Sequence, residues 1–192
     1  MIRKFIIIPR FGNTASGFDF GSIRENVTQL DVVNNYTQAF VRHLQMSGII
    51  HELIPNDKNP GIDEKDRLPL VPAGTMAIIC GCGVSKFKKT KRNFSSAVAF
   101  GHKNKKYAHY FLEGMNDWGK SLNYDHGSQK PLYETDNPFV RSFPEQIPIL
   151  EIRPFQIGAP GVDDYWPRMD DLGRILANCV REIILDMTPT RR

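Results

Sequence analysis

The sequence predicts one α/β domain spanning residues 1–192, in which a mostly parallel, twisted sheet of about five strands is the middle of three αβα layers. Short apolar runs that end at proline or glycine are typical of strands buried on both faces. Longer segments with apolar residues three and four positions apart alternate with these runs, as helices do in βαβ units. The 192 residues are 41% apolar and 24% charged, which fits one folded domain and excludes disorder.

The first elements along the chain are a strand, a helix and a second strand. The apolar run at 5–8 is ended by Pro9 and predicts the first strand. Thr28 is suited to cap a helix, and Gly48 lies where that helix should end. Residues 49–54 then predict a second strand, so the unit should be βαβ with a right-handed crossover. The inward stripe of the helix consists of Val32, Val33, Tyr36, Phe40, Val41 and Leu44.

The later elements follow in the order strand, strand, helix, strand, helix. We expect these strands at 76–80, 96–100 and 147–152, and these helices at 105–122 and 169–186. Two polar stretches, 56–74 and 124–146, read as loops, and the first has room for a helical turn around 63–68.

Nothing in the sequence predicts export or membrane insertion. Three cysteines cannot all pair within one chain, so a reducing interior is the default compartment. The apolar run before Pro9 is too short for a signal peptide, and no stretch approaches the roughly 20 residues that span a bilayer. We therefore expect a cytoplasmic protein without a membrane partner, with a place in a virion as the alternative.

The formal net charge of +4 is concentrated in one segment. Removing the eight basic residues between positions 86 and 106, where there is no acidic residue, leaves −4 for the rest of the chain. This segment is either a solvated loop or an arm that binds an anionic polymer or an acidic partner surface. Nucleic acid is the weaker choice, because no known nucleic-acid-reading motif accompanies the charge. The basic residues are Lys86, Lys88, Lys89, Lys91, Arg92, Lys103, Lys105 and Lys106.

A second candidate contact region is the acidic and aromatic stretch at 163–167. Exposed Tyr and Trp side chains are favoured at interfaces, so Tyr165 and Trp166 could face a protein partner or a second copy of the chain. The alternative is that Trp166 covers the core beside the last helix.

The candidate active site lies where the last strand ends, because ligands of open α/β sheets bind beyond the carboxyl ends of the strands. Glu151 follows an apolar run there, and burying its carboxylate is costly unless it is paired or protonated. Glu151 is either a general acid or base (or a metal ligand), or the partner of Arg153 or Arg10 in a structural ion pair. Glu151 and Arg153 are therefore the candidate catalytic residues. The candidate binding residues are Arg10, Lys86, Lys88, Lys89, Lys91 and Arg92.

The spacing of metal-ligating residues predicts no metal site and no cofactor. Cys80 and Cys82 are one residue too close for a CxxC pair, and no second pair exists. The sequence also contains no nucleophile elbow, dinucleotide fingerprint or P-loop. Zinc would need a replacement site, which would form if any of His102, His109, His126 and Cys80 converge near Glu151. The histidines are His43, His51, His102, His109 and His126, and no two of them form a short pair on one helix face.

Four short motifs occur in an order that resembles a known family. They are Ile8-Pro9-Arg10-Phe11-Gly12, Leu44-Gln45-Met46-Ser47-Gly48, Ala77-Ile78-Ile79-Cys80 and Leu150-Glu151-Ile152-Arg153-Pro154-Phe155. Their order resembles the type 3 class of zinc-dependent N-acetylmuramoyl-L-alanine amidases, which cleave the bond between glycan and stem peptide in bacterial cell walls. The likeness covers most of the chain and implies the α/β fold of these enzymes. The N-formylglutamate amidohydrolases, of related architecture, resemble the chain less.

The same resemblance implies that the family's zinc ligands are missing. Phe11 stands in place of the first His, Gln29 in place of the zinc-binding Glu, and Cys80 or a neighbour in place of the second His. Only Glu151 matches a functional residue, and Phe cannot bind a metal. We therefore expect a non-catalytic relative that acts in binding or assembly, with a phage-derived component as one source that fits. The alternative is an active amidase that cleaves peptidoglycan or a similar amide with Glu151 as general acid and base.

Overall fold

The structure is a computed structural model of the chain. It describes residues 2–10, 12–14, 17–19, 23–24, 27–54, 72–84, 93–100, 104–122, 126–128, 132–134, 147–157 and 165–187. Within these ranges the helices are α1 (Gln29–Met46), α2 (Lys105–Ser121) and α4 (Met169–Met187), and a 3₁₀ turn, η4 (Trp166–Arg168), leads into α4. The strands of the central sheet are β1 (Lys4–Pro9), β6 (His51–Leu53), β7 (Thr75–Cys80), β9 (Asn93–Phe100), β10 (His126–Ser128), β11 (Leu132–Glu134) and β12 (Ile149–Arg153).

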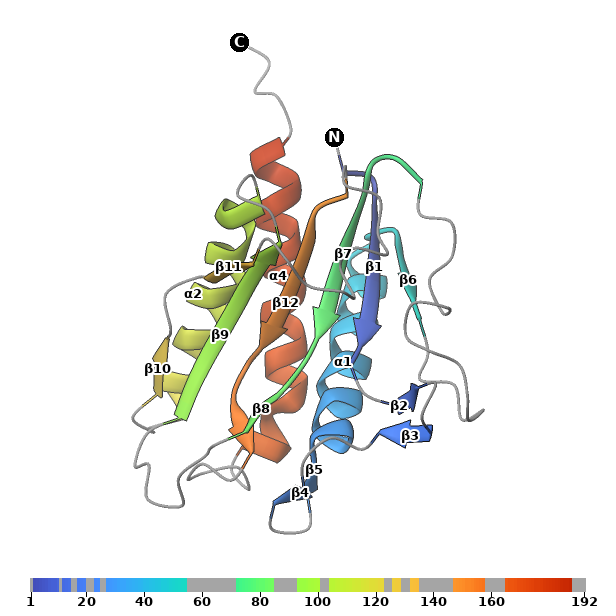
Figure 1. Cartoon of the computed structure of the whole chain (residues 1–192). Coiled ribbons are helices and arrows are strands. Elements are labelled where there is room, and N and C mark those ends of the chain that lie inside the picture. Colours follow the sequence, from blue (N-terminus) through green and yellow to red (C-terminus); the bar gives the residue numbers. More distant parts are fainter. Residues whose placement is uncertain are drawn as a thin grey trace.

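The central sheet has seven strands and is mostly parallel (Figure 1). Its order is β10-β9-β12-β7-β1-β6, and β11 also pairs with β9. All neighbours run parallel except β9 and β12, which are antiparallel. The five predicted strands are confirmed. The loop expected at 124–146 is partly wrong, because it contains β10 and β11, which are too short to show a strand pattern in the sequence.

In the part of the chain that the structure describes, three two-stranded sheets lie outside the central sheet. They pair β2 (Gly12–Thr14) with β3 (Gly17–Asp19), β4 (Ile23–Arg24) with β5 (Val27–Thr28), and β8 (Gly83–Val84) with β13 (Gln156–Ile157). The last pair extends the neighbouring strands β7 and β12 beyond their carboxyl ends.

The ends of α1 are set by the residues that the sequence indicated. Thr28 Oγ1 accepts a hydrogen bond from Asp31 N at 3.0 Å, and Asp31 Oδ2 accepts one from Thr28 N at 3.2 Å. This reciprocal capping box satisfies two backbone donors at the start of the helix. Gly48 follows the helix with φ of 67°, a left-handed conformation that glycine adopts without steric cost. The β1–α1–β6 unit is confirmed, because β1 and β6 pair in parallel.

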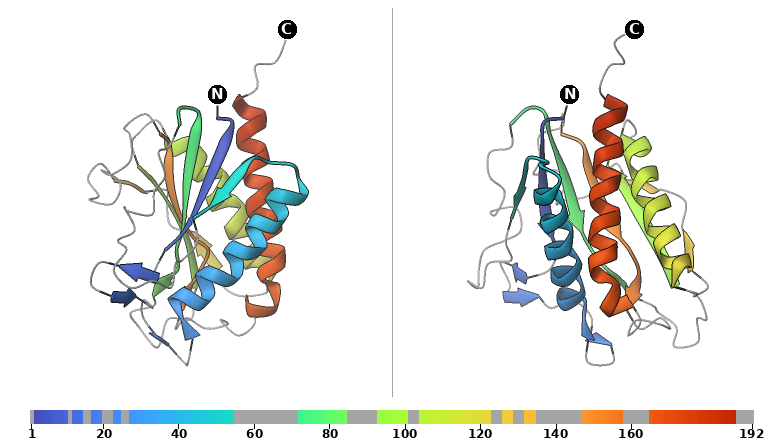
Figure 2. Two further views of the ribbon diagram at one scale, coloured as in Figure 1. Left: turned by 90° about the vertical axis from the view of Figure 1, so that its right-hand side faces the viewer. Right: turned by 180° about the vertical axis from the view of Figure 1, so that it is seen from behind.

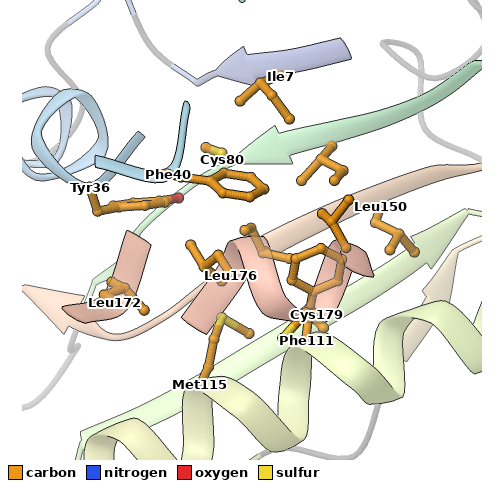
Figure 3. Close-up of a cluster of buried hydrophobic side chains, with 14 of the residues drawn as sticks. Ile7, Tyr36, Phe40, Cys80, Phe111, Met115, Leu150, Leu172, Leu176 and Cys179 are labelled. Carbon is orange, nitrogen blue, oxygen red and sulfur yellow. The ribbon is translucent and has the colours of Figure 1, made fainter. Parts of the chain in front are cut away.

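All three helices pack against one face of the sheet (Figure 2). Figure 3 shows side chains of α1, α2 and α4 meeting those of the strands in one apolar cluster, among them Phe40, Phe111 and Leu176. The backbones of α1 and α4 approach closely at Gly173, where a Cβ atom would lie 2.5 Å from the carbonyl carbon of Ala39.

The opposite face of the sheet is also covered. Ile6 and Ile8 of β1 and Ala77 and Ile79 of β7 belong to a second apolar cluster and are buried there. Because both faces are buried, the three-layer α/β class is confirmed, although no helix of the described ranges lies on this second face. None of the described helices has the length and apolar character needed to cross a membrane.

Candidate functional site

The candidate site lies at the carboxyl ends of β1, β7 and β12, on the face opposite the helices. Successive side chains of a strand point to opposite faces, so Arg10 shares a face with the buried Ile6 and Ile8. Glu151 and Arg153 lie on the same face of β12 by the same alternation. Backbone hydrogen bonds continue the strand pairing there, from Arg10 N to Cys80 O and from Gly81 N to Ile152 O, both 2.8 Å.

Glu151 is the centre of a three-residue ion cluster, Arg10–Glu151–Arg153. Its Oε1 atom accepts a hydrogen bond of 2.5 Å from Nη1 of Arg10 and one of 2.9 Å from Nε of Arg153. The Glu151 side chain is only 3% exposed, whereas Arg10 is 41% and Arg153 35% exposed. The cluster therefore places a buried carboxylate beneath two partly exposed guanidinium groups.

The two arginines keep Glu151 ionised. Burial by itself raises the pKa of a carboxyl group, because it disfavours the charged form. The hydrogen bond from Arg153 and the positive charges of Arg10 and Arg153 act in the opposite direction and outweigh burial. The pKa of Glu151 is therefore held below its ordinary value. The sequence left open whether Glu151 is a general acid or base or a member of an ion pair. The observed geometry is that of an ion pair, and both of the suggested partners, Arg10 and Arg153, take part in it.

Gly81 permits the contact between strands that are not neighbours. β7 lies between β1 and β12, so Arg10 must reach across the end of β7 to meet Glu151. A Cβ atom at position 81 would lie 2.9 Å from Glu151 Oε1 and 3.4 Å from Arg153 Cγ. The sequence placed Gly81 only in a turn and missed this role. Counting alternate residues along the three predicted strands puts position 81 on the same face as positions 10, 151 and 153, but only the strand order places it between them.

The turn after β7 is fixed from the helical side by two buried side chains of α1. Tyr36 donates its hydroxyl to Gly81 O at 2.8 Å, and Gln29 donates from Nε2 to Cys82 O at 2.5 Å. Burial raises the pKa of the Tyr36 hydroxyl, so it stays a neutral donor. Gln29, which replaces the zinc-binding Glu in the resemblance, thus holds the backbone of this turn.

The cysteines beside this turn are protonated thiols. Cys80 and Cys82 are buried, and burial raises the pKa of each to about 12. Since the thiolate is the form that attacks substrates and binds metals, neither residue is prepared for such a role at neutral pH.

Within the ranges that the structure describes, no three His, Cys, Asp or Glu side chains come close enough to hold a metal ion. His43 contacts Asp170 at 3.0 Å, and His51 Nδ1 lies 2.7 Å from Ile49 O, so both have structural partners. His109 lies on the exposed side of α2, and His126 belongs to β10. His102 lies outside the described residues.

Most of the basic segment lies outside the described residues. This applies to Lys86, Lys88, Lys89, Lys91, Arg92 and Lys103, and also to Phe11. Lys105 and Lys106 begin α2, and Lys106 Nζ contacts Asp186 Oδ2 of α4 at 2.9 Å. This ion pair ties the end of the segment to the body of the domain.

The idea that Tyr165 faces a partner is wrong. Tyr165 is fully buried, and the centroid of its ring lies 4.9 Å from that of Phe155 and 5.3 Å from that of Trp118. The chain enters the 3₁₀ turn after Tyr165, so adjacent side chains point in different directions. Trp166 is 39% exposed and remains the accessible member of the pair.

The fold is that of the N-acetylmuramoyl-L-alanine amidases. The chain is similar to the crystal structure of the N-acetylmuramoyl-L-alanine amidase from Clostridium difficile 630, with a TM-score of 0.73 and 15% identity over 97% of this chain and 99% of that one. The catalytic domain of the CD27L endolysin targeting Clostridia difficile gives 0.69 at 12% identity, covering 94% and 97%. The CwlD amidase from Clostridioides difficile, solved in complex with the GerS lipoprotein, gives 0.67 at 12% identity, covering 96% and 99%.

These likenesses are structural only. No protein-family model matches the sequence, and no curated protein matches it either. At 12–15% identity the comparison establishes the amidase fold that the sequence predicted, and the activity of this chain has to be argued from its own residues.

Proposed function

We propose that this chain is a non-catalytic protein on an amidase scaffold, which acts by binding or assembly. The observation that carries this proposal is the double ion pair of Glu151 with Arg10 and Arg153. Glu151 is the one residue that the amidase resemblance matches to a functional role, so its state decides the argument.

The ion pairs disfavour both catalytic roles of Glu151. A general acid must carry a proton near neutral pH, but the pKa of Glu151 is lowered rather than raised. A carboxylate with a lowered pKa is also a weak general base. In addition, Oε1 already accepts two charged hydrogen bonds. The carboxylate is thus engaged with the protein's own cations.

An assay of peptidoglycan cleavage tests this proposal. The purified chain is incubated with peptidoglycan and with muropeptides, with and without added Zn²⁺, beside the Glu151→Gln variant. We expect no release of stem peptide above background under any of these conditions. Metal-dependent release that disappears in Glu151→Gln would contradict the proposal.

That last result would establish the alternative, an active amidase-type hydrolase. The observation that favours this alternative is the position of an ionised carboxylate at the strand end where the fold binds ligands. An active enzyme would have to release Glu151 from its arginines when substrate binds.

The partner side of the proposal rests on charge and on exposed aromatic surface. The basic residues at 86–106 and the partly exposed Trp166 are the surfaces we propose for an acidic protein, an anionic polymer or a second copy. Size-exclusion chromatography with light scattering at two salt concentrations tests this part. A monomer that is insensitive to salt and captures no partner would count against it.

A cytoplasmic or virion location, including a phage origin, is part of the same proposal. Cell fractionation and mass spectrometry of purified virions would test it. Recovery only from a secreted or membrane fraction would contradict it.

A further inference from the structure

We draw no further inference here: the strongest candidate, the surface patch between α1 and β6 where the apolar side chains of Met46 and Ile50 are exposed, carries no proposal, because nothing in the part of the chain that the structure describes shows what covers it.

Discussion

Removing both arginines of the Arg10–Glu151–Arg153 cluster should reverse the way in which protein stability depends on pH. The perturbation is the double variant Arg10→Gln/Arg153→Gln, compared with each single variant. In the unaltered chain the two guanidinium groups outweigh burial and lower the pKa of Glu151. Without them burial alone acts on the carboxyl group and should raise its pKa.

The size of the effect follows from the exposures of the three side chains. Each single variant leaves Glu151 with one cation, and the lost arginine is partly hydrated, so we expect a loss of about 1 kcal/mol. The double variant leaves a carboxylate that is 3% exposed without its two arginine partners, which should cost about 3 kcal/mol at neutral pH. The two losses should therefore be more than additive, as is usual for residues in one network.

The free energy of unfolding should change with pH in opposite directions in the unaltered chain and in the double variant. In the unaltered chain the pKa of Glu151 is lower in the folded state than in the unfolded state, where it is near 4.5. The ionised Glu151 therefore stabilises the fold above pH 4.5, and this stability is lost as pH falls through the lower folded-state pKa. A raised folded-state pKa does the reverse, so the double variant should become more stable as pH falls from neutral towards 4.5. Urea unfolding at several pH values measures both slopes.

Two outcomes would refute this reasoning. One is a double variant with the same pH slope as the unaltered chain, and the other is strictly additive losses in the two single variants. Addition of Glu151→Gln to the double variant is the internal control. It removes the stranded charge and should recover part of the lost stability and abolish the reversed slope.

Three further predictions concern the core, the thiols and the first helix. Gly173→Ala should destabilise the fold by about 2 kcal/mol, because the new Cβ atom would meet the backbone of α1. Gly114→Ala should destabilise it less, because the Cβ atom there would meet only side-chain atoms. Equal losses of stability in urea unfolding would contradict this prediction. Cys80 and Cys82, with pKa values of about 12, should not react with iodoacetamide at neutral pH until the protein is unfolded. Rapid labelling of the native protein would contradict the conclusion that both residues are buried, protonated thiols. Thr28→Ala should cost about 1 kcal/mol through loss of the capping box, whereas Thr28→Ser should cost little.

The fold was predictable because its signals are local. The apolar runs of β1 and β7 are continuous and end at proline or at a glycine turn, and the cap of α1 is visible as Thr28 followed three residues later by Asp31. By contrast, β10 and β11 are three residues long and take their conformation from pairing with β9. Such strands depend on tertiary contacts, which periodicity does not reveal.

The site was predictable only in part, because it depends on strand order. The sequence named Arg10, Glu151 and Arg153, and it offered either arginine as the partner of Glu151. It could not show that both bind one oxygen atom, since that requires β7 to lie between β1 and β12. For the same reason it missed Gly81, whose importance arises from a contact between residues 10 and 151 above it.

The ionisation of Glu151 is the property on which the proposed non-catalytic function of this amidase fold depends. Burial at a strand end pushes the pKa of a carboxyl group upward, towards the range of a general acid. Cations from the neighbouring strands push it downward, and the same carboxylate then becomes a fixed counter-ion. Both outcomes are compatible with the same sheet, because the strand pairing that positions Glu151 is made by backbone atoms and does not depend on the side chain at position 10. The ionisation of Glu151 is therefore set by the side chains at positions 10 and 153, which are the positions altered in the double variant.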